Sequence, residues 1–357
     1  MCAKVSYLSD KYTLSQIMDG YREAVKLLYI HIFEYMTEKG FFEHLSGEIT
    51  PNDIRDWSSG NAYQRFEHLS DGITLNDLME KMNISKDRKQ IFSAIIQCLA
   101  DMGVLEVKNG STVLLKSAKC PFCICEIDTK YFDVVGNVPK EIAKLVKRFD
   151  PLSSDSTVKF DGNFNRFWNA IFLAPYYAYG RDEAVKWVGF EDATIADLGC
   201  GPGYALEKLA VHAGKHGRIT AVEVSKDFLD IAAKRVNGMC KVDFIKSDVD
   251  NGLPFLESSK YDGVTAIGLL HFLRKPEQFL SEVNRILKPG GKFAMGNQYL
   301  IKPTMYQGAT DLYFSIIGQY SKAHTSEQIR QMLSSSGLNL NYTFEVGNYG
   351  WFYARKE

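Results

Sequence analysis

The sequence predicts an α/β protein whose C-terminal half forms a doubly wound parallel sheet, preceded by a mainly helical domain. Two observations predict the sheet. Short apolar runs alternate with amphipathic segments between residues 194 and 295, and the first of these runs ends in a glycine-rich turn, Gly199-Cys-Gly-Pro-Gly203. Such alternation is typical of parallel sheets with right-handed crossovers, which bind ligands beyond the carboxyl ends of their strands.

Length and composition are those of an ordinary globular protein. The 357 residues are enough for two domains, with 45% hydrophobic and 24% charged residues. A formal net charge of −1 argues against nucleic acid or an anionic membrane as the main partner. The N-terminus has no apolar core of the length that an export signal needs, and we expect a cytoplasmic protein.

The seven cysteines are odd in number, and without an export signal we expect them to be reduced. Cys120-Pro-Phe-Cys123-Ile-Cys125 has the local spacing of thiolate ligands. No second cysteine or histidine pair follows to complete a tetrahedral site. A thiol cluster is therefore the expectation here, ahead of a metal site.

The N-terminal part contains one long helix and one compact pattern. Residues 13–39 carry apolar side chains over more than one helical face, which predicts burial from several sides, as in a dimer. Residues 47–70 are polar and predict a loop. Residues 72–117 predict two short helices and a hairpin, a winged-helix pattern. The second helix is basic only in its first turn, which disfavours DNA binding.

An aromatic segment at residues 163–188 precedes the sheet. Its rings suit either a buried core or the wall of an acceptor pocket, and the sequence leaves both interpretations open. A helix beginning at Pro139 is expected before it. The rings chosen as candidate acceptor contacts are Phe167, Trp168, Phe172, Tyr176 and Tyr177.

The glycine turn predicts a ligand site. Glycine permits positive φ and close approach of a ligand, while the helix that follows presents free N–H groups. The next strand ends at Glu223, 20 residues after Gly203. An acidic residue at that place can accept hydrogen bonds from both ribose hydroxyls.

Four motifs together resemble the class I methyltransferases that use S-adenosylmethionine and have a Rossmann-like seven-stranded sheet. They are Asp197-Leu-Gly-Cys-Gly-Pro-Gly203, Glu223, Ser247-Asp248 and Leu287-Lys-Pro-Gly-Gly-Lys292. The resemblance implies that the glycines pass the methionine part, that Glu223 holds the ribose, and that Asp248 and Val249 flank the adenine. The full set of cofactor residues implied is Asp197, Gly199, Gly201, Gly203, Glu223, Val224, Ser247, Asp248, Val249 and Ile267.

With its winged-helix pattern, the whole chain resembles small-molecule O-methyltransferases of plant phenolic and bacterial polyketide pathways. In that group the N-terminal domain forms an intertwined homodimer and roofs the acceptor pocket. The resemblance implies a dimerisation domain at 1–118, a linker and acceptor-pocket segment at 119–188, and an S-adenosylmethionine-binding domain at 189–357. The implied partners are a small acceptor and a second copy of the chain.

His271 is the candidate general base. It follows the fourth strand, where the O-methyltransferases carry a His-Asp-Trp motif, but Phe272 and Leu273 stand in place of the Asp and Trp. A histidine can take the proton of a phenol, or it can have a structural or cofactor-loop role. Asn297 stands near the position of a glutamate in the plant members, and we expect it, with Tyr306, near the acceptor.

These residues predict methyl transfer to a small aromatic or apolar acceptor, with O-methylation by His271 as the leading mechanism. C- or N-methylation by proximity, without a base, is the alternative. A protein of another class, a winged-helix regulator that binds S-adenosylmethionine without catalysis, also fits the motifs.

Overall fold

The computed structural model describes residues 7–46, 72–110, 112–116, 120–122, 127–128, 158–298, 307–317 and 324–357. Contacts divide the chain into two units, and each is described by itself. The first contains residues 1–21, 159–301 and 319–357; the second contains residues 22–158 and 302–318.

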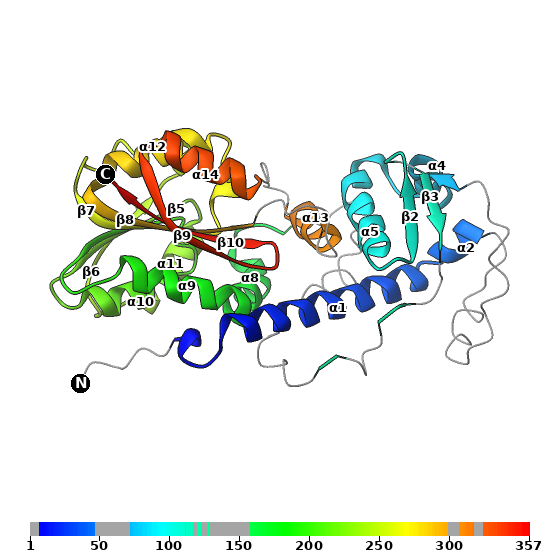
Figure 1. Ribbon diagram of the computed structural model, residues 1–357, viewed down its shortest axis with the longest axis horizontal. Helices are drawn as coiled ribbons and strands as arrows, with labels where there is room; N and C mark the ends of the chain where they lie inside the picture. Colours follow the sequence, from blue (N-terminus) through cyan, green and yellow to red (C-terminus); the bar gives the residue numbers. More distant parts are fainter. Residues whose placement is uncertain are drawn as a thin grey trace. The chain divides into compact units, whose positions relative to one another are not determined.

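The first unit is built on a seven-stranded sheet in the order β6-β5-β4-β7-β8-β10-β9 (Figure 1). Neighbours from β6 to β8 are parallel, whereas β10 runs antiparallel to both β8 and β9. The predicted doubly wound sheet is therefore confirmed, closed by the expected C-terminal hairpin. The strands are β4 Thr194–Leu198, β5 Arg218–Glu223, β6 Lys241–Lys246, β7 Tyr261–Ile267, β8 Leu287–Gln298, β9 Leu338–Val346 and β10 Tyr349–Lys356.

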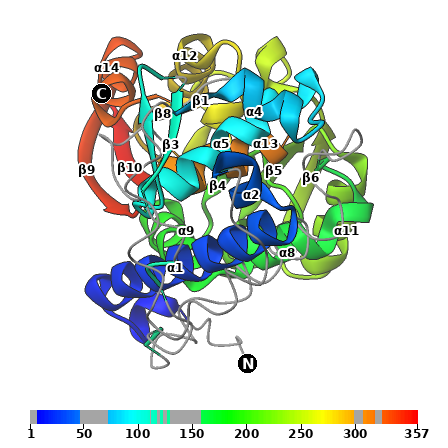
Figure 2. The ribbon, with the colours of Figure 1, turned by 90° about the vertical axis from the view of Figure 1, so that its right-hand side faces the viewer.

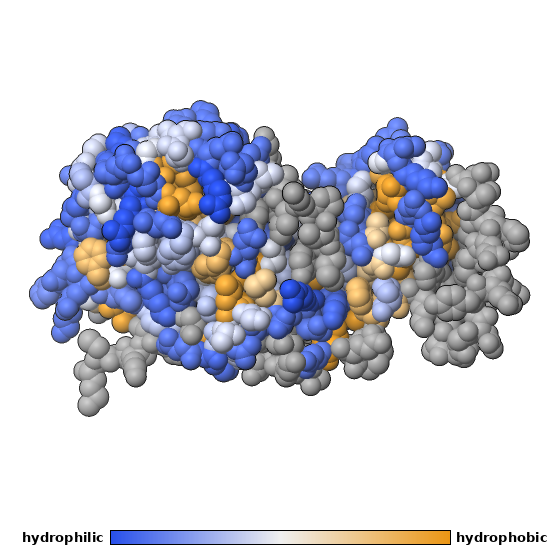
Figure 3. Space-filling view, viewed as in Figure 1, coloured by the Kyte–Doolittle hydropathy of each residue, from blue (hydrophilic) through white to orange (hydrophobic). Residues whose placement is uncertain are grey.

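Helices cover both faces of this sheet. Figure 1 shows α9 (Pro175–Val188) and α10 (Tyr204–Ala213) on one face and α12 (Pro276–Ile286) and α14 (Ser326–Ser335) on the other. The core lies between, where strand side chains such as Phe293 and Phe352 pack with those of α12 and α14. The remaining helices of the unit are α8 Asn165–Leu173 and α11 Lys226–Arg235. Hydrophilic side chains cover most of the face seen in Figure 3, with hydrophobic ones in small patches.

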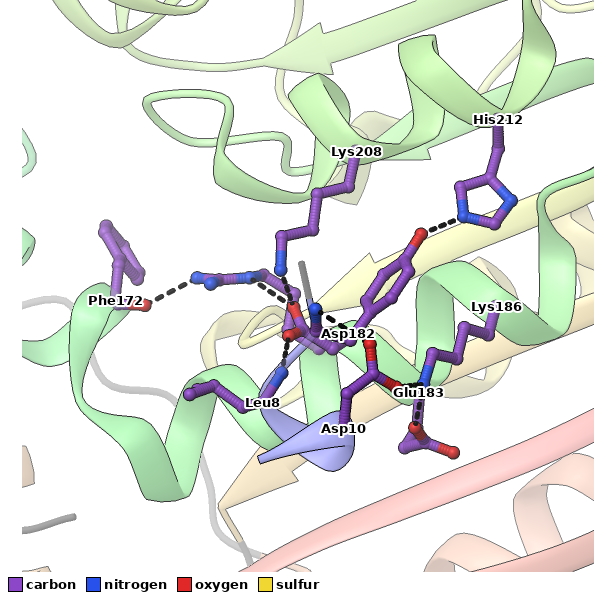
Figure 4. A network of polar contacts seen from close by, with 10 residues as sticks. Leu8, Asp10, Phe172, Asp182, Glu183, Lys186, Lys208 and His212 are labelled. Carbon is purple, nitrogen blue, oxygen red and sulfur yellow. Dashed lines mark hydrogen bonds and ion pairs between the residues drawn. The ribbon is translucent and has the colours of Figure 1, made fainter. Parts of the chain in front are cut away.

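The N-terminal turn η1 (Leu8–Asp10) belongs to the first unit, although the rest of that unit begins far along the chain. The backbone N–H of Leu8 donates to Asp182 Oδ2 at 2.9 Å, and Lys208 pairs with the same fully buried carboxylate (Figure 4). Tyr7 contacts His212 through its hydroxyl group. Charge-assisted hydrogen bonds thus hold this turn on α9 and α10.

The second unit contains most of α1 (Leu14–Glu38), which confirms the long helix expected at 13–39. After α2 (Phe41–Ser46) come α4 (Leu75–Lys81) and α5 (Lys89–Asp101), joined through η3 (Lys86–Arg88). Thr74 caps α4 by accepting from the N–H of Asp77, as predicted. Three short strands form an antiparallel sheet in the order β1-β3-β2, whose members are β1 Ile73–Thr74, β2 Leu105–Lys108 and β3 Thr112–Leu115 (Figure 2).

The structure divides the chain differently from the domain boundaries expected at residues 118 and 188, and two segments differ. Both α8 and α9 join the sheet unit, because α9 packs on β7, β8 and β10. The helix α13 (Gln307–Ile316) joins the second unit, because it packs closely on α5. A Cβ atom at Gly308 would lie only 2.4 Å from the backbone nitrogen of Cys98. No sequence pattern predicted this contact.

Several expectations lie outside the described residues: the loop at 47–70, the helix beginning at Pro139, and the side chains of Cys123, Cys125 and Tyr306. Within the described ranges, no helix combines the length and apolar character needed to cross a membrane. The same part of the chain places no group of three or more His, Cys, Asp or Glu where it could hold a metal ion.

The contact between α9 and β10 gives the first testable prediction. A Cβ atom at Gly180 would lie 1.9 Å from Cε2 of the fully buried Trp351. We expect Gly180→Ala to lower the free energy of unfolding by about 1 to 3 kcal/mol, despite the better helix propensity of alanine. Urea denaturation followed by tryptophan fluorescence measures it. Gly162→Ala, whose Cβ would have only an ordinary 3.4 Å contact, is the control; equal stability of both variants would contradict the packing.

Candidate functional site

The glycine turn after β4 leads directly into α10. Gly199, Gly201 and Gly203 have φ angles of 69°, 53° and 88°, which other residues rarely adopt. A side chain at Gly203 would meet Ala232 at 2.9 Å, and one at Gly199 would meet Leu269 at 3.0 Å. At Gly201 the nearest atom would be Cζ of Phe172, 3.9 Å away. The turn is therefore packed tightly at both ends and faces α8 in the middle.

Glu223, at the end of β5, fastens this turn. Its carboxylate accepts hydrogen bonds from the backbone N–H of Gly201 at 3.0 Å and of Ser225 at 2.9 Å. Burial raises the pKa of the Glu223 carboxyl, although these backbone hydrogen bonds oppose the shift. Each carboxylate oxygen has a further lone pair. The side chain can thus shape the turn and still accept from a ribose hydroxyl.

Asp197 lies beneath the turn and is 1% exposed. Its Oδ1 accepts from the hydroxyl of Thr265 at 2.7 Å, whereas its Oδ2 is buried without a hydrogen-bond partner among the described residues. Burial raises the pKa of Asp197 to about 7, the Thr265 hydrogen bond opposes this, and the charge of Glu223 adds to it. A buried carboxylate oxygen is costly unless it is paired, so a ligand ammonium group would fit here.

The other implied cofactor residues lie at the ends of the neighbouring strands. Asp248 begins the short helix η7 (Val249–Asn251) after β6, and its side chain is 43% exposed. The Ser247 N–H donates to the carbonyl of Glu223 at 3.1 Å. Val224 is exposed beside Glu223, and Ile267 ends β7. The fold therefore gathers residues from four strand ends at one edge of the sheet.

His271 lies in the turn η8 (Leu270–Phe272) that follows β7, and it is 2% exposed. Its Nδ1 is 2.9 Å from Oδ1 of Asn297, at the end of β8. Because an amide oxygen only accepts, Nδ1 carries the proton and Nε2 is the basic nitrogen of the neutral ring. Burial lowers the pKa of His271 to about 4; the hydrogen bond to Asn297 opposes this shift and the nearby His324 adds to it.

The sequence interpretation placed Asn297 with the acceptor contacts, and the structure adds a contact with His271. In the structure Asn297 is fully buried and holds the His271 ring, while its Nδ2 has no hydrogen-bond partner among the described residues. Its location at the carboxyl end of a strand was visible in the sequence. The pairing with His271 depends on β7 and β8 being neighbours.

The aromatic segment forms both a core and a surface over the turn. Phe167 and Trp168 are buried, and Trp168 stacks on Phe160 at 4.4 Å and on Phe172 at 5.8 Å. Phe160 in turn meets Phe272, next to His271, edge-on at 5.0 Å. Contacting aromatic rings thus lead from the glycine turn to the His271 loop; Phe167 and Trp168 form a core, and the acceptor-pocket wall stays a prediction.

Two further tyrosines of this segment pack elsewhere. Tyr176 meets Tyr21 edge-on at 5.1 Å. Tyr177 is buried against Tyr349 at 5.0 Å, and both hydroxyls lie close to Gly268, where β7 ends. The sequence did not point to Phe160, Thr265 or Tyr349; only the Thr265 position, directly opposite Asp197 across a parallel pair, could have been found from strand register.

Comparison with known proteins agrees with this geometry. Residues 195–291 match the family described as "Methyltransferase domain". This segment is a class I methyltransferase domain. S-Adenosylmethionine is the cofactor of such a domain, and the glycine turn, the unpaired Asp197 oxygen and Glu223 fit it.

Curated relatives cover this domain only. The chain is 32% identical over 111 residues to malonyl-[acyl-carrier protein] O-methyltransferase of Halalkalibacterium halodurans, covering 31% of this chain and 41% of the relative. It is 30% identical over 152 residues to demethylmenaquinone methyltransferase of Lactococcus lactis, covering 41% and 58%. The match spans between 19% and 58% of the length of the first curated relatives.

One solved structure resembles the entire chain. The CurJ carbon methyltransferase aligns with a TM-score of 0.62 and 15% identity, covering 98% of this chain and 96% of its own. At this identity the likeness concerns the fold. It extends the resemblance beyond the methyltransferase domain to the helical unit.

Glu223 provides a prediction on the cofactor. Glu223→Ala removes the acceptor of the Gly201 N–H in the turn and of the Ser225 N–H after β5, so we expect affinity for S-adenosylhomocysteine to fall about 10- to 100-fold by calorimetry. Glu257→Ala, an exposed carboxylate, serves as control and should bind normally. Unchanged affinity in Glu223→Ala would show that the turn does not hold this cofactor.

The buried imidazole provides a prediction on stability. The pKa of His271 in the folded protein, about 4, lies below the usual value of about 6.5. The unfolded chain therefore binds more protons between these values, and stability present above pH 6.5 is lost as the pH falls towards 4. Between pH 7 and pH 5 we expect wild type to lose about 2 kcal/mol more than His271→Gln in urea denaturation. Parallel losses would contradict a buried neutral histidine.

Proposed function

We propose that this chain transfers a methyl group from S-adenosylmethionine to a small, readily ionised acceptor, with His271 as the general base. One observation carries the proposal. A neutral imidazole, oriented by Asn297, lies at the same sheet edge as the glycine turn and is linked to it by contacting aromatic rings, Phe172 and Trp168 of α8 and Phe160 before it.

The cofactor-binding role falls to residues of the strand ends. The glycine turn and the buried Asp197 oxygen would receive the methionine part, Glu223 the ribose, and Asp248 with Val249 the adenine. The bound cofactor supplies an electrophilic methyl group on a sulfonium. The protein contributes by holding the acceptor in line at near-attack distance and by excluding water.

The properties of His271 restrict the acceptor. Burial lowers the pKa of this imidazole to about 4, and an amide, not a carboxylate, holds its Nδ1, so an imidazolium gains little stabilisation here. A simple phenol with a pKa of about 10 would give up its proton poorly to such a base. An enol, a quinol or a carbon acid between two carbonyl groups would ionise more readily.

O-Methylation of such an acceptor is the first candidate, and C-methylation of the same enolate is the second. The buried Nδ2 of Asn297 favours an enolate in either case, because it can donate to an anionic acceptor oxygen while Oδ1 holds His271. The relatives named above act, by their names, on malonyl-[acyl-carrier protein] and on demethylmenaquinone. N-Methylation needs no base and is the remaining alternative.

The second unit is proposed to be a winged-helix dimerisation domain. Its support is the order β1-α4-α5-β2-β3 with an antiparallel three-stranded sheet. The side chains of α5 are buried on most sides, among them Ile91, Ile95 and Leu99, which leaves little of α5 to enter a DNA groove. Apolar side chains of α1 are already buried within one chain, so the homodimer rests on the family resemblance and light scattering tests it.

The decisive experiment combines binding with an acceptor screen. Calorimetric titration with S-adenosylmethionine and S-adenosylhomocysteine comes first, followed by methyl-labelled transfer to phenols, quinols, 1,3-dicarbonyl compounds and amines. Transfer to an acidic hydroxyl or carbon acid supports the proposal, and NMR of the product identifies the methylated atom. Binding without transfer to any acceptor would favour the non-catalytic regulator.

His271→Ala tests the base. We expect turnover to fall about 10²- to 10⁴-fold, with S-adenosylhomocysteine affinity within about threefold of wild type. The exposed histidine in His216→Ala is the matched control and should leave both unchanged. Near-normal turnover, or loss of cofactor binding instead of turnover, would remove His271 from the reaction.

A further inference from the structure

Asp250 has an unusual concentration of hydrogen bonds for a side chain outside the proposed cofactor and base residues. It lies in η7, two residues after Asp248, and is 8% exposed. Its carboxylate accepts from the N–H of Arg274 at 3.0 Å, from the N–H of Lys275 at 3.2 Å and from Nε of Arg274 at 3.0 Å. Charge-assisted hydrogen bonds of this kind are stronger than neutral ones.

These donors lie at the end of the loop that carries His271. Arg274 and Lys275 follow η8 after Leu273, and Pro276 begins α12. The negative charge of Asp250 is favourable there, because the first turn of a helix carries a partial positive charge. At the other end of the loop, the N–H of Gly268 donates to the carbonyl of Gly296 at 2.7 Å. The His271 loop is therefore fastened at both ends.

The same short helix, η7, joins Asp250, which binds the end of the His271 loop, to the proposed adenine site at Asp248. Asp248 accepts from the N–H of Asp250 at 3.0 Å, and its Oδ2 is 3.8 Å from a guanidinium nitrogen of Arg274. Arg274 thus contacts both carboxylates of η7. Burial acts to raise the pKa of Asp250, but the hydrogen bonds from Arg274 and Lys275 outweigh it and the pKa is lowered, so the carboxylate stays charged at neutral pH.

We propose that Asp250 is a positioning residue for methyl transfer, whose carboxylate holds the loop of residues 268–275 so that His271 stays buried against Asn297. The inference rests on the proposed function. It explains why a buried carboxylate outside the proposed cofactor and base residues is paired mainly with backbone N–H groups of this one loop. The hydrogen bond from His271 to Asn297 and the proximity of His271 to His324 both depend on the position in which this loop is held.

A graded series of variants tests this role. Asp250→Ala removes every acceptor, Asp250→Asn keeps one amide oxygen for the backbone N–H groups, and Arg274→Ala removes only the side-chain donor. We expect turnover to fall about tenfold, about threefold and less than twofold in that order, with S-adenosylhomocysteine affinity within about threefold throughout. Asp243→Asn, an exposed carboxylate on β6, should match wild type.

A readout without catalysis separates this inference from the proposed function. The His271 imidazole, assigned in NMR spectra by comparison with His271→Gln, should titrate in wild type well below the usual histidine range. In Asp250→Ala its pKa should rise by a unit or more, and Asp250→Asn should restore most of the difference. This holds even if wild type transfers no methyl group.

The same series of variants shows which results would contradict the positioning role of Asp250. An unchanged His271 titration in a folded Asp250→Ala variant would overturn the positioning role. So would equal losses of turnover and cofactor affinity across the series, because a general weakening of the fold lowers both together. If Asp250→Ala does not fold, Asp250→Asn decides: a loss of turnover of about threefold with unchanged cofactor affinity supports the positioning role, and wild-type turnover in that variant overturns it.

Discussion

The two hydrogen bonds that Glu223 accepts from the backbone of Gly201 and Ser225 are the interaction on which the candidate site depends. The bond from Gly201 joins the turn after β4 to the end of β5, and the bond from Ser225 holds the Glu223 side chain in place, so the turn stays fastened to the sheet edge. A buried carboxylate tolerates its desolvation because charged acceptors gain more from backbone donors than neutral ones do. The positive φ angles of the glycines are the local condition for this arrangement.

The proposed reaction centre is built on the opposite electrostatic principle. Around Glu223 the chain supplies donors for a charge, whereas around His271 it supplies an amide, aromatic rings and a second histidine. Such surroundings keep the imidazole neutral and place its proton on Nδ1. A base of this kind suits an acceptor that is already close to ionised, and it links the choice of substrate to the burial of one side chain.

The segment that joins the helical unit lies close in sequence to the residues that contact His271. Asn297 is the second-last residue of β8; after it the chain contributes α13 to the second unit, and His324 lies two residues before α14 begins. Both residues that act on His271 therefore flank the segment that packs on α5. The tight contact of Gly308 with Cys98, and the hydrogen bond from the Gly308 N–H to Asp101 at 2.7 Å, anchor that segment.

The sequence by itself determined the elements of the sheet and the glycine turn, because strand alternation, helix periodicity and glycine spacing are local signals. It also indicated Glu223, Asp248 and His271, which stand directly after strands. Only the tertiary structure decided that Asn297 orients His271, that Thr265 pairs with Asp197, that α13 joins the helical unit and that Asp250 fastens the His271 loop. These contacts join residues between 24 and more than 200 positions apart, and strand order and helix packing, which no local pattern encodes, bring them together.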